Sequence, residues 1–109
     1  SVIGRYHVAA KSNLAFAGTF SVLMMPDRDA FHIGYALMPW AQGKGWAKEL
    51  VINGLRWVFE HTDQQQIFAI TEPDNTASSF VLVNTGFSKL ESIQQIGKLL
   101  DVYVIHRNA

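Results

Sequence analysis

Short apolar runs alternate with turn-forming residues over the first third of the chain. Runs at 6–10, 14–25 and 31–38 are separated by clusters rich in Lys, Ser, Asn, Pro and Asp. Runs of this length, bounded by turn residues, are typical of β-strands. The short connections predict three antiparallel strands, and Gly18, inside the second run, is expected to mark a bulge.

A helical period replaces this pattern in the segment 45–61. Apolar or small residues recur on one stripe and polar residues on the opposite one, as in a helix that packs on a sheet; the stripe contains Ala47, Leu50, Val51, Gly54 and Val58. A glycine inside a helix costs about 1 kcal/mol relative to alanine. We therefore expect close contact between this helix and the sheet at Gly54.

The rest of the chain predicts three more strands and a second helix. A short apolar strand at 67–70 follows the first helix, and this strand–helix–strand spacing predicts a right-handed parallel crossover. Asn75 is placed to cap a helix over 76–84, and Gly86 to end it. Strands are expected at 87–93 and 98–106. The fold class is α/β (α+β): one domain over 1–109, with a mixed, mostly antiparallel sheet, a central parallel pair and two main helices.

Composition narrows the classes of function. The chain has 109 residues and no net charge, and 49% of its residues are hydrophobic. No basic block is present, so we expect neither nucleic-acid nor membrane binding. The chain has no cysteine, which excludes disulfides and a cysteine nucleophile and is compatible with a cytoplasmic location. The histidines lack metal-ligand spacing, and we predict no metal site.

The segment 32–47, HIGYALMPWAQGKGWA, predicts a strand, a glycine-rich loop and the start of a helix. Pro39 cannot donate to a sheet and is expected to end the strand. Gly43 and Gly45 permit left-handed backbone angles and close approach of a ligand. Free N–H groups at the start of the helix would bind a phosphate or pyrophosphate. The alternative is a strand-to-helix turn without a ligand; the patterns of the P-loop and of dinucleotide-binding loops are absent.

Within that segment, Gln42-x-x-Gly45-x-Ala47 resembles the acyl-coenzyme A loop of the GNAT acetyltransferases, which reads Gln/Arg-x-x-Gly-x-Gly/Ala. The sequence before and after this loop resembles I-G-Y … Q-G-K-G-Y-A-x-E, the pattern of the branch of ribosomal-protein N-terminal (RimJ/RimL-like) acetyltransferases. Here Trp46 replaces the usual Tyr.

A second motif supports the same branch. Asn75-Thr76-Ala77-Ser78, followed by Gly86-Phe87, resembles its N-t-a-S … G-F pattern without a gap. The two motifs span 32–87, about half of the chain, in the order of the family. On this resemblance the chain is identified as a GNAT-like domain.

The resemblance implies acetyl-CoA as the acyl donor. Main-chain groups of Leu37 and Met38 would bind the pantetheine arm, although both residues could simply belong to the core. The pyrophosphate would lie on the loop and the first helical turn, with Asn75 and Ser78 on the second helix as further contacts; the loop residues are Gln42, Gly43, Lys44, Gly45, Trp46 and Ala47. Gln42 would hold the loop in shape. The side chain of Lys44 could equally be solvated, with no role in binding.

The family reaction is direct attack of an amine on the thioester. It needs a base for the proton of the amine and a donor for the departing thiolate. His32 occupies the position at which relatives often have Glu, and a histidine is a competent base near neutral pH. Ser78 is the candidate donor. The alternatives are a strand histidine satisfied by its neighbours and a helix serine bonded to its own backbone. Glu72 could face the cleft, but the favoured alternative is a surface carboxylate.

The family fold begins with a strand and two helices that line much of the acceptor side. Only about 30 residues precede the strand at 31, so we expect those helices to be missing from a truncated or reduced member. The run 6–10 would then be an unpaired edge, and a face that includes Phe16 and Phe20 would lose its cover. A homodimer is the predicted consequence.

Two functions follow as hypotheses. The first is an N-acetyltransferase that uses acetyl-CoA and a primary amine, either a protein N-terminus or a small molecule. The alternative is a CoA-binding or assembly module without turnover, because the acceptor-binding half is missing.

Overall fold

A computed structural model describes residues 2–108 and contains six strands, two α-helices and one short 3₁₀ helix. In chain order the elements are β1 (Gly4–Ala9), β2 (Phe16–Met24), β3 (Phe31–Leu37), η1 (Pro39–Ala41), α1 (Trp46–His61), β4 (Gln66–Thr71), α2 (Thr76–Asn84), β5 (Ser88–Gln95) and β6 (Lys98–His106). The predicted elements are confirmed, with boundaries that shift by one or two residues.

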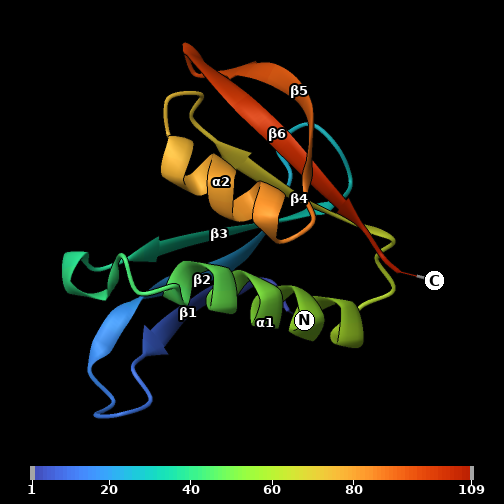
Figure 1. Ribbon diagram of the computed structural model, residues 1–109. Helices are drawn as coiled ribbons and strands as arrows, with labels where there is room; N and C mark the ends of the chain where they lie inside the picture. Colours follow the sequence, from blue (N-terminus) through green and yellow to red (C-terminus); the bar gives the residue numbers. More distant parts are fainter. Residues whose placement is uncertain (1, 109) are drawn as a thin grey trace.

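The six strands form one sheet in the order β1-β2-β3-β4-β6-β5 (Figure 1). All neighbours are antiparallel except β3 and β4, which confirms the predicted parallel crossover through α1. This parallel pair is short: only His32 with Phe68 and Ile33 with Ala69 are in register. Beyond Ile33 the two strands are no longer paired, so the middle of the sheet opens towards the carboxyl end of β3.

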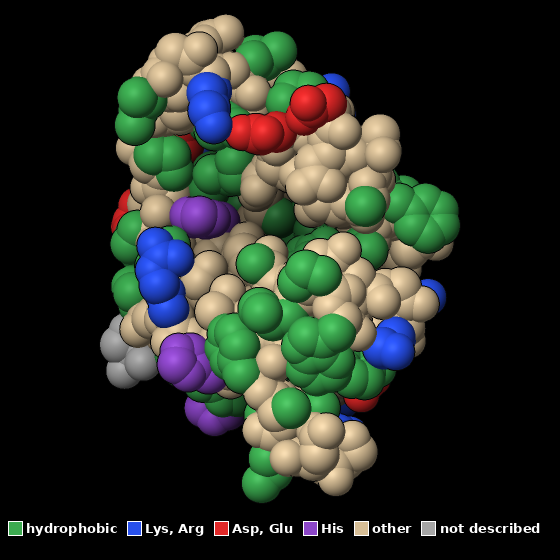
Figure 2. Space-filling model, turned by 90° about the vertical axis from the view of Figure 1, so that its left-hand side faces the viewer, with side chains coloured by type: hydrophobic (Ala, Val, Ile, Leu, Met, Phe, Trp, Pro, Cys, Tyr) green, Lys and Arg blue, Asp and Glu red, His purple; other side chains and the backbone are tan. Residues whose placement is uncertain are grey.

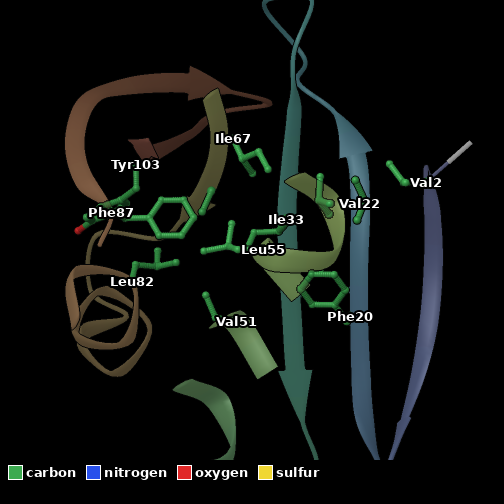
Figure 3. Packing of buried hydrophobic residues seen from close by; sticks show 12 residues of the cluster. Val2, Phe20, Val22, Ile33, Val51, Leu55, Ile67, Leu82, Phe87 and Tyr103 are labelled. Carbon is green, nitrogen blue, oxygen red and sulfur yellow. The ribbon is translucent and has the colours of Figure 1, made fainter. Parts of the chain in front are cut away.

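Both helices lie on one face of the sheet, in front of it in the view of Figure 1. Figure 3 shows side chains of the sheet and of α1 pointing towards one another in the main core, among them Phe20, Ile33, Val51 and Leu55. A Cβ on Gly54 would lie 2.3 Å from the ring of Phe20. The expected close contact between helix and sheet at Gly54 is therefore confirmed.

The opposite face, which we call the outer face, has a smaller core of its own. Met25, Phe68, Val102 and Val104 are buried there. Arg28, on the loop between β2 and β3, lies over Phe68, with its guanidinium carbon 5.0 Å from the ring centroid. This loop covers the β4–β6 part of the outer face and leaves the β1–β3 part open.

One expectation about exposed aromatic residues is wrong. Phe20 was expected on a face without cover, but it is 5% exposed and packs beneath α1. Phe16 is 45% exposed, as expected. The reason is the bulge beside Gly18: β1 pairs Val8 with Gly18 and then Ala9 with Phe16. This extra residue in β2 changes the alternation between the two faces, so the two phenylalanines have different environments.

Candidate active site

A cleft opens where β3 and β4 separate, between the first turns of α1 and α2. Its volume is about 1010 Å³, at the upper end of the range of small-molecule sites. Figure 2 looks onto the side of the molecule where the loop before α1 and the start of α2 lie, and it shows a hollow with hydrophobic side chains. The cleft is lined by Tyr35, Ala36, Leu37, Gln42, Gly43, Gly45, Trp46, Ala47, Lys48, Asn75, Thr76, Ala77, Ser78, Phe80 and Val81.

The glycine loop forms one end of this cleft. Gly43 and Gly45 have left-handed backbone angles, with φ of 73° and 78°, and a Cβ on either would meet no atom within 4 Å. Gly45 is the N-cap of α1, and no side chain caps the helix. The side-chain amide of Gln42 donates to the carbonyl of Leu37 at 3.0 Å and ties the loop back to β3. The first-turn N–H groups of α1 therefore face an open site suited to an anion.

Of the ten predicted coenzyme-binding residues, all except Met38 and Lys44 line the cleft. The backbone N–H of Met38 donates to the carbonyl of Ala17 at 2.8 Å, so this donor is already used within the fold. Lys48 lines the cleft although the sequence analysis did not single it out. The signal for it was its place in the first turn of the helix that follows the loop, where a cation adds to the attraction of an anion.

On α2, the two predicted polar residues, Asn75 and Ser78, make different contacts. The side-chain oxygen of Asn75 accepts a hydrogen bond from the backbone N–H of Ser78 at 3.1 Å, which is the predicted N-cap. The hydroxyl of Ser79, not that of Ser78, donates to the carbonyl of Asn75 at 3.2 Å. The Ser78 hydroxyl is thus left to face the cleft.

Tyr35 is a functional candidate that the sequence analysis used only as part of a motif. Its hydroxyl oxygen lies 3.4 Å from the hydroxyl oxygen of Ser78, so the pair joins β3 to α2 across the cleft. Burial raises the pKa of Tyr35, while the hydrogen bond between Tyr35 and Ser78 opposes this shift. The phenol consequently stays protonated at neutral pH and is a proton donor. Sequence spacing gave no signal for a contact between residues 43 positions apart.

His32 lies at the start of the opening between β3 and β4 but does not line the cleft. It pairs with Phe68 on the outer face, whereas Tyr35 faces the helices. Burial lowers the pKa of His32, and the positive charge of Arg5 lowers it further, against hydrogen bonding with the backbone of Met24, which raises it. The imidazole is therefore neutral at physiological pH and can accept a proton.

Glu72 lies outside the cleft. Its carboxylate pairs with the ammonium of Lys98 at 2.9 Å, and both side chains are more than half exposed, in agreement with the surface alternative.

No group of three or more potential metal ligands occurs among residues 2–108. Within the same residues, no helix is long and apolar enough to cross a membrane.

Comparison with known proteins gives a family match and a set of similar folds. The model of the acetyltransferase (GNAT) domain family matches residues 3–88. A comparison with curated proteins found no match. A ribosomal-protein-S5-alanine acetyltransferase from Vibrio fischeri is similar in structure, with a TM-score of 0.83 and 24% sequence identity; the alignment covers 96% of this chain and 62% of that one.

Two further solved structures have the same fold. A GNAT-family acetyltransferase from Bacillus anthracis has a TM-score of 0.81 at 20% identity, and a variant of a spermidine N-acetyltransferase from Vibrio cholerae has 0.79 at 16%. The alignments cover 94% of this chain in both cases, and 65% and 64% of those proteins. The chain therefore spans less than two thirds of the length of these proteins.

Proposed function

Because the chain belongs to the GNAT acetyltransferase family, we propose that it transfers the acetyl group of acetyl-CoA to a primary amine, on a protein N-terminus or a small molecule. The observation that carries this proposal is the cleft itself. It connects the uncapped start of α1, which suits a pyrophosphate, with the Tyr35–Ser78 pair at the opening of the sheet. An elongated ligand with a phosphate group at one end and a reactive group at the other fits this arrangement.

The residues present fit acetyl-CoA. Gly43 and Gly45 leave open space where any other residue would place a Cβ, so backbone N–H groups can reach phosphate oxygens. Lys48 adds a positive charge in the first turn of α1. Bound there, acetyl-CoA would supply an activated thioester. Leu37, at the end of β3, and Val81, on α2, offer apolar surface for the pantetheine arm.

Proton transfer is divided between the two faces of the sheet. As a primary amine attacks the acetyl carbon, the new C–N bond forms, the C–S bond breaks, and the nitrogen loses a proton. Neutral His32 accepts that proton from the outer face, directly or through water. The Ser78 hydroxyl donates a proton to the departing sulfur, Tyr35, hydrogen-bonded to Ser78, returns a proton to Ser78, and Tyr35 then regains its own proton from solvent. Each group has the protonation state at neutral pH that its role requires.

The motifs bear on the acceptor, and the edge strand β1 bears on the oligomeric state. The fit of the loop and of the α2 motif to the ribosomal-protein N-terminal acetyltransferase branch is the reason to keep a protein N-terminus beside small molecules as an acceptor class. The exposed backbone of β1 at the edge of the sheet, with neither Lys nor Pro in Gly4–Ala9, supports pairing of two copies. Sedimentation at low micromolar concentration tests the dimer, and a monomer of 12.2 kDa would contradict it.

The second candidate function is CoA binding without turnover. Its support is the position of His32, which does not line the cleft. The two functions differ in one assay: acetyl-CoA is incubated with a panel of amines, and thiol release and the mass of the acetylated amine are both measured. Amine-dependent thiol release supports the enzyme. CoA binding without release for any amine supports the binding module, and absence of binding rejects both.

A further inference from the structure

One row of side chains crosses the open part of the outer face. Arg5 on β1 is in register with Ser21 on β2, and Ser21 is in register with Gly34 on β3. Residues directly opposite one another in antiparallel strands project from the same face. Since His32 and Gly34 are two positions apart on β3, this row lies on the same face as His32.

The row ends at the opening of the sheet. Gly34 is the first residue of β3 beyond the two that pair with β4. It has no side chain, and a Cβ there would meet only the hydroxyl oxygen of Ser21, at 2.9 Å. The Ser21 hydroxyl lies beside Gly34 and donates to its carbonyl at 3.4 Å, so an acceptor would pass this hydroxyl to place its amine at the opening, beside His32. Neighbouring strands are about 4.8 Å apart, so the backbone of Arg5 lies about 10 Å from that of Gly34, and its long side chain shortens the remaining distance.

The charge along this row has one sign. Arg5 is exposed and has no ion-pair partner among residues 2–108. No Asp or Glu occurs at the outer-face positions of β1, β2 and β3, which are Arg5, His7, Thr19, Ser21, Leu23, His32, Gly34 and Ala36. Of the carboxylates on the loop between β2 and β3 and on β5, those of Asp27 and Glu91 are paired with Arg28, whereas exposed Asp29 has no ion-pair partner within residues 2–108.

From this juxtaposition we propose that the acceptor is an amine that also carries a carboxylate, held by Arg5 while its amine lies beside His32 at the opening of the sheet. The proposal rests on the acetyltransferase function proposed above and names its substrate class. Ser21 offers a hydroxyl between the two ends of such an acceptor. A polyamine would place a second positive charge against Arg5 with no carboxylate to neutralise it, so this site disfavours polycations.

Three acceptors on one four-carbon frame test the proposal: γ-aminobutyrate, γ-aminobutyramide and putrescine, which end in an anion, a neutral amide and a cation. We expect kcat/KM, corrected for the fraction of free amine, to be about 10-fold higher for γ-aminobutyrate than for the amide, because a charge-assisted hydrogen bond to Arg is replaced by a neutral one. Putrescine should be the poorest of the three. Equal values for all three amines in the unmodified protein would overturn the proposal.

Arg5→Gln should remove the preference for γ-aminobutyrate without changing the Kd of CoA. The matched control is Lys11→Gln, which removes a cation that pairs with Glu49 of α1, and this variant should keep the preference. A preference that survives in Arg5→Gln would also overturn the proposal. Gly34→Ala, whose methyl group would lie 2.9 Å from the Ser21 hydroxyl oxygen and push it towards the acceptor, should raise KM for all three amines.

A binding measurement separates this proposal from the acetyltransferase function. The ring resonances of His32 are followed by NMR, with CoA present, during titration with each amine. A shift with γ-aminobutyrate that is lost in Arg5→Gln supports the site even if no amine is acetylated. Without turnover the proposed function would fail, but the carboxylate site would not. No shift with any amine would overturn the site.

Discussion

Tyr35 and Ser78 are the two residues whose contact bears most directly on the proposed chemistry. Their hydroxyl oxygens are 3.4 Å apart. Tyr35 lies on β3 and Ser78 on α2, and η1, α1 and β4 lie between these two elements in the chain. The sequence indicated Ser78 as a candidate proton donor through the motif on α2. Tyr35 appeared only as part of the I-G-Y pattern, with no role of its own. Their contact depends on how α2 packs beside α1 and on β4, which no local pattern specifies.

If Tyr35 supplies its proton through Ser78, the two hydroxyls act as one unit. Tyr35→Phe and Ser78→Ala should each lower kcat about 10- to 100-fold, with little change in the Kd of CoA. The double variant should lose no more than the worse single one. Tyr6→Phe is the control, because it also removes a tyrosine hydroxyl. That hydroxyl donates to the carbonyl of Val2 and does not line the cleft. Additive losses in the double variant would show that the hydroxyls act separately.

His32 gives the reaction a predicted pH dependence. Its pKa is lowered from about 6.5, chiefly by burial. At saturating amine, kcat should therefore fall as the pH drops, with a midpoint below 6.5. His32→Gln should lower kcat by about 10²-fold or more and remove this acid limb, whereas His106→Gln, at the end of β6, should do neither. An unchanged pH profile in His32→Gln would return His32 to the role of an ordinary strand residue.

The same shift affects stability with a defined sign. Between the lowered pKa of His32 and 6.5, the unfolded chain binds more protons than the folded one. The free energy of unfolding should therefore fall as the pH drops through this interval. Above the interval, the contribution of His32 to stability should be complete. Urea denaturation at several pH values, compared with His32→Gln, measures this contribution.

At the scale of the elements, local sequence signals predicted most of the fold. Turn clusters, the helical stripe and the capping residue Asn75 placed the six strands and both α-helices, because each of these signals acts over a few residues, whereas the short 3₁₀ helix Pro39–Ala41 was not predicted. Phe20 was misplaced because a single extra residue in a bulge reverses which face a strand residue occupies. The contact between Tyr35 and Ser78, and the separation of His32 from the cleft, depend on packing between elements, and spacing along the chain does not encode them.

The contact between α1 and β2 gives a test at this scale. Gly54→Ala places a Cβ 2.3 Å from the Phe20 ring, so one of the two elements must move. We expect a net loss of about 1–3 kcal/mol in the free energy of unfolding, despite the better helix propensity of alanine. The smaller side chain in Phe20→Leu should make the Gly54→Ala change less costly in the double variant. Equal costs of Gly54→Ala with Phe20 and with Leu at position 20 would contradict this packing.

For the whole molecule, the important feature is a sheet that opens in its middle with different chemistry on its two faces. The helix face carries the uncapped start of α1, the glycine loop and the hydroxyl pair. The outer face carries His32 and, beside it, the row from Arg5 to Gly34. A donor on one face and an acceptor on the other would meet at the opening. This division accounts for the distance of His32 from the cleft without removing it from the reaction.

Binding of acetyl-CoA at the glycine loop can be tested by calorimetry. The Kd of CoA is measured for three proteins: the unmodified chain, Gly45→Ala and Gly97→Ala. Gly45 and Gly97 have nearly the same left-handed φ, 78° and 75°, and a Cβ on either meets no atom within 4 Å. The two substitutions therefore carry similar backbone strain, but only Gly45 lines the cleft. We expect a Kd at least about 10-fold weaker in Gly45→Ala, because the added methyl group blocks approach of phosphate to the backbone, and an unchanged Kd in Gly97→Ala. Equal CoA affinity in the two folded variants would contradict binding at this loop.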